Sequence, residues 1–138
     1  MADRYYLLSK DTGGGPSLIG ELRRLRRGDY QFRYMLRGDR FPEWYLQIPG
    51  LRDIHQLYGS REARRFILHR VVPEEESWAA DVLMQQHAIK GYDEWDMLEA
   101  LIVQHAQYEN ESDPLPLCDS NQIFYFYREI PEDANRYD

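Results

Sequence analysis

The stretch LIGELRRLRRGDYQFRYML, residues 18–36, decides the fold of this chain. Its second half alternates strictly, and every second side chain is apolar or aromatic: Tyr30, Phe32, Tyr34 and Leu36. A period of two predicts a strand over 30–36 with one buried face and one wetter face. The first half, 18–26, alternates less regularly around the small Gly20. Because the turn signal Arg27-Gly28-Asp29 joins the halves, we expect a hairpin.

Two further runs predict strands of the same sheet. Residues 5–9 form a short run rich in apolar side chains, and residues 123–127 lie in the aromatic run IFYFYREI. Aromatic and β-branched residues favour strands. The intervening DTGGGPS, residues 11–17, is expected to be a loop, because three glycines and a proline sustain neither a helix nor a central strand. We expect the C-terminal strand to return and pair with the N-terminal strands.

The region between the hairpin and the last strand predicts helices. Their expected positions are around 61–70, 75–88 and 93–106, after a short helix at 53–58. Ser60 is expected to cap the first of the three long helices, and Asp93 the last, with Asp96 at its third position. The middle helix is expected to start at Pro73, which places three glutamates, 74–76, in its first turn. Its inner stripe is expected to contain Trp78, Val82 and Leu83.

This order of elements predicts an α+β fold, with a small antiparallel sheet and a helical insert before the C-terminal strand. The 138 residues are expected to form one domain, 1–138, with a core of its own and a polar, peripheral tail from about residue 131. The side chains expected to be buried are Phe32, Tyr34, Phe66, Trp78, Trp95, Leu98 and Phe124.

Composition indicates a cytoplasmic protein. The single cysteine, Cys118, cannot form an internal disulfide, which is typical of a reducing compartment. No apolar run approaches the roughly 18 residues of a membrane span, and the first residues contain no signal-like apolar segment. We therefore expect no membrane partner.

The sequence predicts no catalytic activity, no cofactor and no metal. The glycines of DTGGGPS precede a strand and are not followed by the lysine of a phosphate-binding loop. The four histidines, 55, 69, 87 and 105, show no metal-ligand spacing. Cys118 stands in no motif that supplies a base, so His87 or His105 would have to reach it through the fold. The acidic clusters are explained as charge at helix starts.

The charge of the chain is divided between its halves. Residues 1–72 carry 14 basic and 8 acidic side chains, a net of +6, whereas residues 73–138 carry 3 and 16, a net of −13. The arginines predicted to bind a partner are Arg23, Arg24, Arg26, Arg27, Arg33, Arg37, Arg61, Arg64 and Arg65. Three interpretations stay open: pairing with the acidic half of the same chain, binding an acidic protein, or binding nucleic acid. The overall charge of −7 opposes sequence-independent DNA binding.

Residues 18–36 resemble the "VGxL…GxYxFxY" hairpin that opens the N-terminal subdomain of HipA-type kinases of toxin–antitoxin systems, a subdomain that also occurs as a separate small protein. The segments FPEWYLQIPG and LYGSREARRFILHRVVP are similar to small bacterial HIRAN-like proteins. Together the resemblance covers roughly residues 18–73. It implies a noncatalytic regulatory or binding module, because the kinase's catalytic motifs are absent. A HIRAN-type domain would instead imply recognition of DNA ends.

The sequence therefore predicts a noncatalytic, protein-binding regulatory module of bacterial or phage origin. One alternative is a module that binds DNA ends or single strands. Another is a phage-borne inhibitor whose acidic half mimics DNA by presenting carboxylates in place of phosphates.

Overall fold

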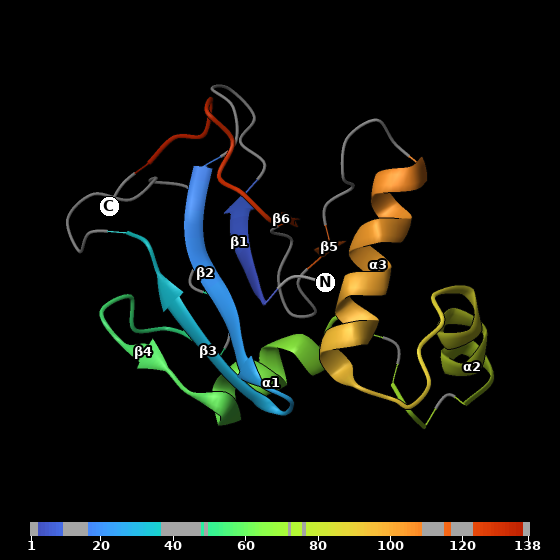
Figure 1. Cartoon of the computed structure of the whole chain (residues 1–138). Helices are drawn as coiled ribbons and strands as arrows, with labels where there is room; N and C mark the ends of the chain where they lie inside the picture. The colour runs from blue at the N-terminus through green and yellow to red at the C-terminus, as the bar shows by residue number, and fades with distance from the viewer. Residues whose placement is uncertain are drawn as a thin grey trace.

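The computed structural model describes residues 3–9, 17–36, 48, 50–71, 73–75, 77–108, 115–116 and 123–136. In this part of the chain six strands form one sheet, in the order β4-β3-β2-β1-β6-β5 (Figure 1). The strands are β1 (Arg4–Ser9), β2 (Ser17–Arg26), β3 (Asp29–Tyr34), β4 (Leu57–Tyr58), β5 (Leu115–Pro116) and β6 (Ile123–Tyr127). Each neighbouring pair is antiparallel, so the α+β prediction is confirmed.

The predicted hairpin forms between β2 and β3, and the predicted return of the last strand places β6 beside β1. The hairpin turns at Gly28, whose φ of 78° lies in the left-handed region that glycine adopts without a steric penalty. The polar tail is not merely peripheral, because the carbonyl of Asn135 accepts a 2.8 Å hydrogen bond from the backbone N–H of Leu18.

Alternate residues of the central strands form the core face of the sheet. Tyr5 and Leu7 of β1 lie opposite Leu22 and Gly20 of β2, and all four are buried. Gly20 leaves room for the neighbouring strand, because a Cβ there would lie 2.8 Å from the ring of Phe32. The close approach of this ring requires the small residue at this position.

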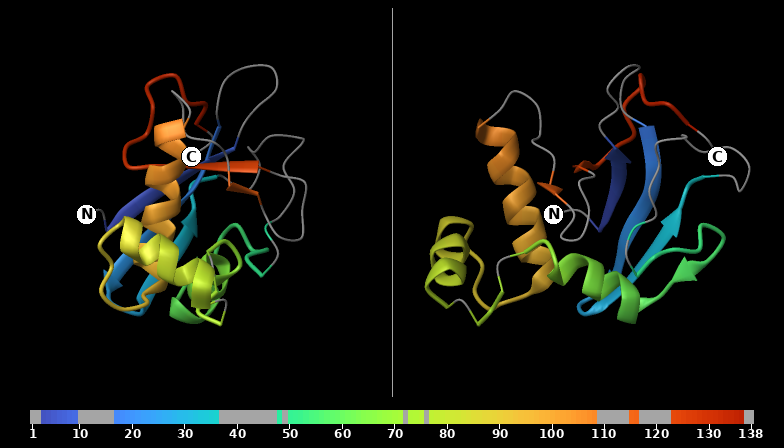
Figure 2. Two further views of the ribbon diagram at one scale, coloured as in Figure 1. Left: turned by 90° about the vertical axis from the view of Figure 1, so that its right-hand side faces the viewer. Right: turned by 180° about the vertical axis from the view of Figure 1, so that it is seen from behind.

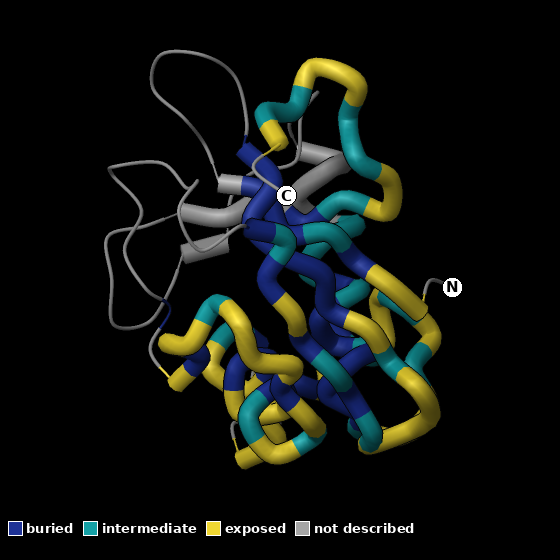
Figure 3. Tube along the Cα trace, turned by 90° about the vertical axis from the view of Figure 1, so that its left-hand side faces the viewer, coloured by how far each residue is buried: buried dark blue, intermediate teal, exposed yellow. Residues whose placement is uncertain are grey.

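Three helices lie in the described segment between β4 and β5: α1 (Ser60–Leu68), α2 (Ser77–Gln86) and α3 (Glu94–Tyr108). Helix α3 covers one face of the sheet, α1 packs near β3, and α2 lies beyond α3 (Figure 2). Figure 3 shows the sheet from the side opposite α3. No helix among the described residues is long and apolar enough to cross a membrane.

The predicted cap of α3 is confirmed, whereas that of α1 is wrong. A side-chain oxygen of Asp93 accepts a 3.1 Å hydrogen bond from the N–H of Asp96. The hydroxyl of Ser60 makes no such bond, because it accepts from the N–H of Tyr30 at 2.9 Å and donates to the carboxylate of Asp29. Ser60 therefore joins the start of α1 to the hairpin instead of capping the helix.

The short helix expected at 53–58 is absent from this described stretch. Leu57 and Tyr58 instead form β4 on the edge of β3. The Asp53 carboxylate accepts from the N–H of His55 at 2.9 Å, which is the local bond of a turn. Tyr58 is buried. Pairing of β4 with β3 places its ring in the core, whereas a single exposed helical turn would leave the ring in solvent. A two-residue strand, β5, lies between α3 and β6 and pairs with β6.

Helix α2 differs most from its prediction. It starts at Ser77, so Glu74 and Glu75 precede it, and it ends at Gln86. The side chain of Trp78 is 80% exposed, while Ala80 and Leu83 are buried. Trp78 and Val82 lie on the opposite side of the helix from Ala80, and a helix with one neighbour buries only one stripe.

The end of α2 is closed by Ala88, whose φ is 55°. The N–H of Ile89 donates to the carbonyl of Met84 at 2.9 Å, the long bond of a Schellman motif.

Trp95 lies at the centre of the core. Its ring is 5.7 Å from that of Tyr30 and 5.5 Å from that of Tyr5, so α3 is fixed to the middle strands. The other predicted core residues that the structure describes, Phe32, Tyr34, Phe66 and Leu98, are also buried. The side chain of Phe124 lies outside the described part.

Candidate binding surface

The face of the sheet opposite α3 carries polar and charged side chains from three strands. Strand register places Arg4, Arg23 and Gln31 in one row, and Tyr6, Glu21 and Arg33 in the next. Leu57 of β4 extends the second row beside Arg33. We call these seven residues the open sheet face. The same alternation that buries the aromatic side chains on the core face places the arginines here.

Glu21 organises the arginines of this face. Its side chain is only 4% exposed, and its carboxylate lies 3.4 Å from Nε of Arg4 and 3.3 Å from Nε of Arg33. A hydrogen bond from Arg4 to the Tyr6 hydroxyl, at 3.1 Å, is the main cause of the raised pKa of Arg4, and Glu21 adds to it. One buried carboxylate therefore orients two guanidinium groups that stay about half exposed.

Arg23 lies between two shallow hollows, one within the open sheet face and one that extends from this face to Asp3, Arg24 and Arg128. One, of about 330 Å³, is lined by Asp3, Arg4, Tyr6, Arg23, Arg24 and Arg128. The other, of about 260 Å³, is lined by Glu21, Arg23, Gln31, Arg33 and Leu57. Arg23 is exposed and forms no ion pair with any described residue. No described carboxylate therefore occupies its guanidinium group.

Arg24 points to the other side of the sheet and is bound within the protein. It lies 2.9 Å from Asp3, 4.0 Å from Asp93 and 3.9 Å from Asp96. Its guanidinium carbon also lies 5.7 Å from the centre of the Trp95 ring. Burial lowers the pKa of Arg24, but the hydrogen bond and charge of Asp3, with the other aspartates, outweigh burial and raise it.

Two more predicted arginines reach the start of α3. Nε of Arg27 lies 3.6 Å from the buried Asp93, and Nε of Arg64 lies 2.9 Å from Glu94. We call Arg24, Arg27 and Arg64, together with Asp93, Glu94 and Asp96, the charge clamp. The charge clamp joins the basic half of the chain to the acidic half. For these three arginines this is the interpretation in which they pair with the acidic half of the same chain.

Burial and the neighbouring Asp93 raise the pKa of Asp96, and Arg24 opposes them. The carboxylates of Asp93 and Asp96 therefore still repel each other, although arginines lie close to both.

The remaining predicted arginines that the structure describes, Arg26, Arg61 and Arg65, are separate from both groups. Arg26 pairs locally with Asp29 at 3.3 Å. Arg61 and Arg65 are exposed on α1 and form no ion pair with the described residues. Arg37 lies outside the described residues. The nine arginines of the prediction are therefore not one surface.

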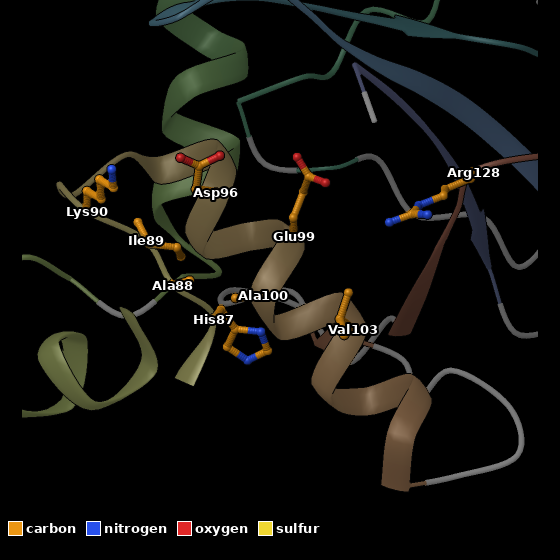
Figure 4. A pocket seen from close by; sticks show the side chains of 9 residues that line it. All are labelled: His87, Ala88, Ile89, Lys90, Asp96, Glu99, Ala100, Val103 and Arg128. Atoms are coloured by element: carbon orange, nitrogen blue, oxygen red, sulfur yellow. The ribbon is translucent and has the colours of Figure 1, made fainter. Parts of the chain in front are cut away.

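A third hollow, of about 300 Å³, lies between the end of α2, the side of α3 and the residue after β6 (Figure 4). Its ionisable lining residues are His87, Lys90, Asp96, Glu99 and Arg128. Glu99 accepts a 3.0 Å hydrogen bond from the Tyr5 hydroxyl. Burial, with the charge of Glu99, raises the pKa of Tyr5. Because both basic and acidic groups line this hollow, it presents no single sign of charge to a ligand.

Among the described residues there is no group of three or more histidine, cysteine or acidic side chains that fits a metal ion. The pairing of Cys118 with His87 or His105 cannot be placed, because Cys118 and the His105 side chain lie outside the described part. The DTGGGPS loop lies outside it as well, apart from Ser17.

Sequence reasoning missed Arg4, Glu21 and Arg128. Glu21 is a charged residue at the end of the apolar first half of β2, and a charge at such a position predicts a buried ion pair. Its partners come from two other strands, so only the strand register identifies them.

The chain matches no protein-family model, no curated protein and no solved structure. The resemblance of residues 18–73 to HipA-type and HIRAN-like proteins therefore stays a prediction.

Proposed function

We propose that this protein is a noncatalytic module that binds an acidic surface of another protein through its open sheet face. The observation that carries the proposal is Arg23, an exposed arginine between two hollows and beside two guanidinium groups held by Glu21. Arginine forms paired hydrogen bonds with carboxylates, and oriented guanidinium groups lose less conformational freedom when they bind.

An acidic protein fits this face better than nucleic acid does. The face contains the buried carboxylate of Glu21, and the chain carries a net charge of −7. Affinity for nucleic acid comes mostly from neutralising phosphates with many basic groups. Leu57, 56% exposed at the edge of the face, adds an apolar contact of the kind found in protein interfaces.

The proposal can be tested by NMR titration of the protein with a short polyglutamate peptide and, separately, with a single-stranded oligonucleotide. We expect the peptide to shift the amide resonances of residues 4, 6, 21, 23, 31 and 33 most. We expect the oligonucleotide to produce weak shifts that vanish at physiological salt. Tighter binding of the oligonucleotide, or peptide shifts that avoid the open sheet face, would refute the proposal.

Two variants sharpen the test. Arg23→Glu should remove the peptide-induced shifts, because it reverses the exposed charge without breaking an ion pair among the described residues. Arg52→Glu makes the same charge change at an exposed position outside the open sheet face and should leave them in place. Equal losses in both variants would mean that net charge alone controls binding.

A further inference from the structure

Two exposed helix faces of this chain are complementary to each other. The outer side of α1 carries Arg61, Arg65 and Leu68, at positions i, i+4 and i+7, which lie together on a helix. We call this the basic α1 face. Both arginines lack an ion pair with any described residue, and Leu68 is 38% exposed.

The outer side of α2 combines apolar and acidic character. Four of the exposed residues of α2 share one side of the helix: Trp78, Asp81, Val82 and Gln85. We call this the acidic α2 face. The exposed Glu74 and Glu75 precede it in the chain. An exposed tryptophan beside a valine is unusual on a protein surface, and tryptophan is enriched where partners bind tightly.

We infer that a second copy of this chain covers these faces, with the basic α1 face of each copy against the acidic α2 face of the other. In this arrangement Leu68 packs on Trp78 and Val82, and the arginines meet Asp81 and the Trp78 ring. The match of both charge and apolar content favours a second copy, because one chain carries both complementary faces.

Both helices lie at the same end of the molecule (Figure 2). A two-fold axis therefore forms the same contact twice, which is the rule for symmetric dimers. The helices have 9 and 10 residues, so each contact is short. Interfaces smaller than about 1,200 Å² are typically weak, and we expect a dimer that dissociates on dilution.

The test is a pair of charge-reversed variants whose masses are followed by light scattering and sedimentation. The first variant carries Arg61→Glu and Arg65→Glu, and the second carries Asp81→Arg and Gln85→Arg. Alone, each variant places like charges at both contacts of a dimer, so each should be monomeric. Mixed together, they should form a heterodimer, because both of its contacts pair opposite charges.

Matched controls separate this effect from net charge and from misfolding. A variant with Arg23→Glu and Arg52→Glu has the same change in charge as the first variant and should dimerise like the unmodified protein. A variant with all four α1 and α2 substitutions should recover the homodimer, and Trp78→Ala should weaken it. Circular dichroism checks that each variant is folded.

The inference fails if the unmodified protein is monomeric up to about 1 mM, where a millimolar dissociation constant would already give substantial dimer. It also fails if the two reversed variants dimerise alone as well as the unmodified protein does. If a lysine-rich peptide binds the monomer at Trp78 instead, the acidic α2 face belongs to a basic partner of another kind.

Discussion

The ring of Trp95 lies nearly parallel to that of Tyr30, with an interplanar angle of 14° and their centres 5.7 Å apart. Tyr30 belongs to the hairpin in the basic half, and Trp95 to the first turn of α3 in the acidic half. The charge clamp surrounds this stack, since Arg24 lies over the same indole. Apolar packing and ion pairs therefore join the two halves at one place.

The two described tryptophans of the helices should differ strongly in their contributions to stability. Trp95→Ala should lower the free energy of unfolding by about 3–5 kcal/mol, because a fully buried ring leaves a cavity. Trp78→Ala should change it by less than about 0.5 kcal/mol, since the side chain is on the surface. Urea denaturation of monomeric protein at low concentration measures both values. A small loss for Trp95→Ala would contradict the packing described above.

Gly20→Ala should destabilise the sheet. The added methyl group would lie 2.7 Å from the carbonyl oxygen of Arg33 and 2.8 Å from the Phe32 ring. Because the carbonyl belongs to a paired strand, it cannot move away freely, and overpacking of this kind costs about 1–3 kcal/mol. Thermal unfolding provides the measurement. The same substitution at the exposed Gly91, where nothing lies within 4 Å, serves as the control.

Ala88→Gly should stabilise the protein. Ala88 has a φ of 55°, a backbone conformation that costs a residue with a Cβ about 1–2 kcal/mol. Glycine avoids this cost, although it also loses more conformational entropy on folding, so we expect a net gain of up to about 1 kcal/mol. An unchanged or lower melting temperature would argue against the Schellman geometry at the end of α2.

Stability should fall at alkaline pH because of Tyr5 and Tyr30. Burial raises the pKa of both hydroxyls, with Glu99 adding to the effect at Tyr5 and Glu94 at Tyr30. The folded state therefore holds these protons more tightly than the unfolded state, so its stability is lost as pH rises above the ordinary tyrosine pKa of 10.0. Tyr5→Phe should flatten this decline in urea titrations at successive pH values. If the decline were unchanged, Tyr5 would not be its source.

The sequence predicts the sheet well because strand alternation is a local property. Residues 30–36 show it without interruption, and the Asp93 cap is likewise a matter of a few adjacent positions. Helix α2 shows the limit of such reasoning. Trp78 with Val82, and Ala80 with Leu83, both have helical spacing, so periodicity defines two stripes without showing which one faces a neighbour.

The binding surface was less predictable than the fold. Arg23 and Arg24 are adjacent in the chain but point to opposite sides of β2, so Arg23 is exposed with no ion pair among the described residues, whereas Arg24 belongs to the charge clamp. The amino-acid composition does not distinguish these two arginines. Only the register of the sheet and the position of α3 distinguish them, and both depend on contacts between residues far apart in sequence.

The division of the arginines into an internal clamp and an open face is tested most directly by comparing two charge-matched variants. One carries Arg24→Glu and Arg27→Glu, and the other carries Arg23→Glu and Arg52→Glu. The measurement is the free energy of unfolding in urea. We predict a loss of about 3 kcal/mol or more for the first variant, because it leaves the buried Asp93 facing new negative charge. We predict a change within about 0.5 kcal/mol for the second. Equal losses in the two variants would contradict the division.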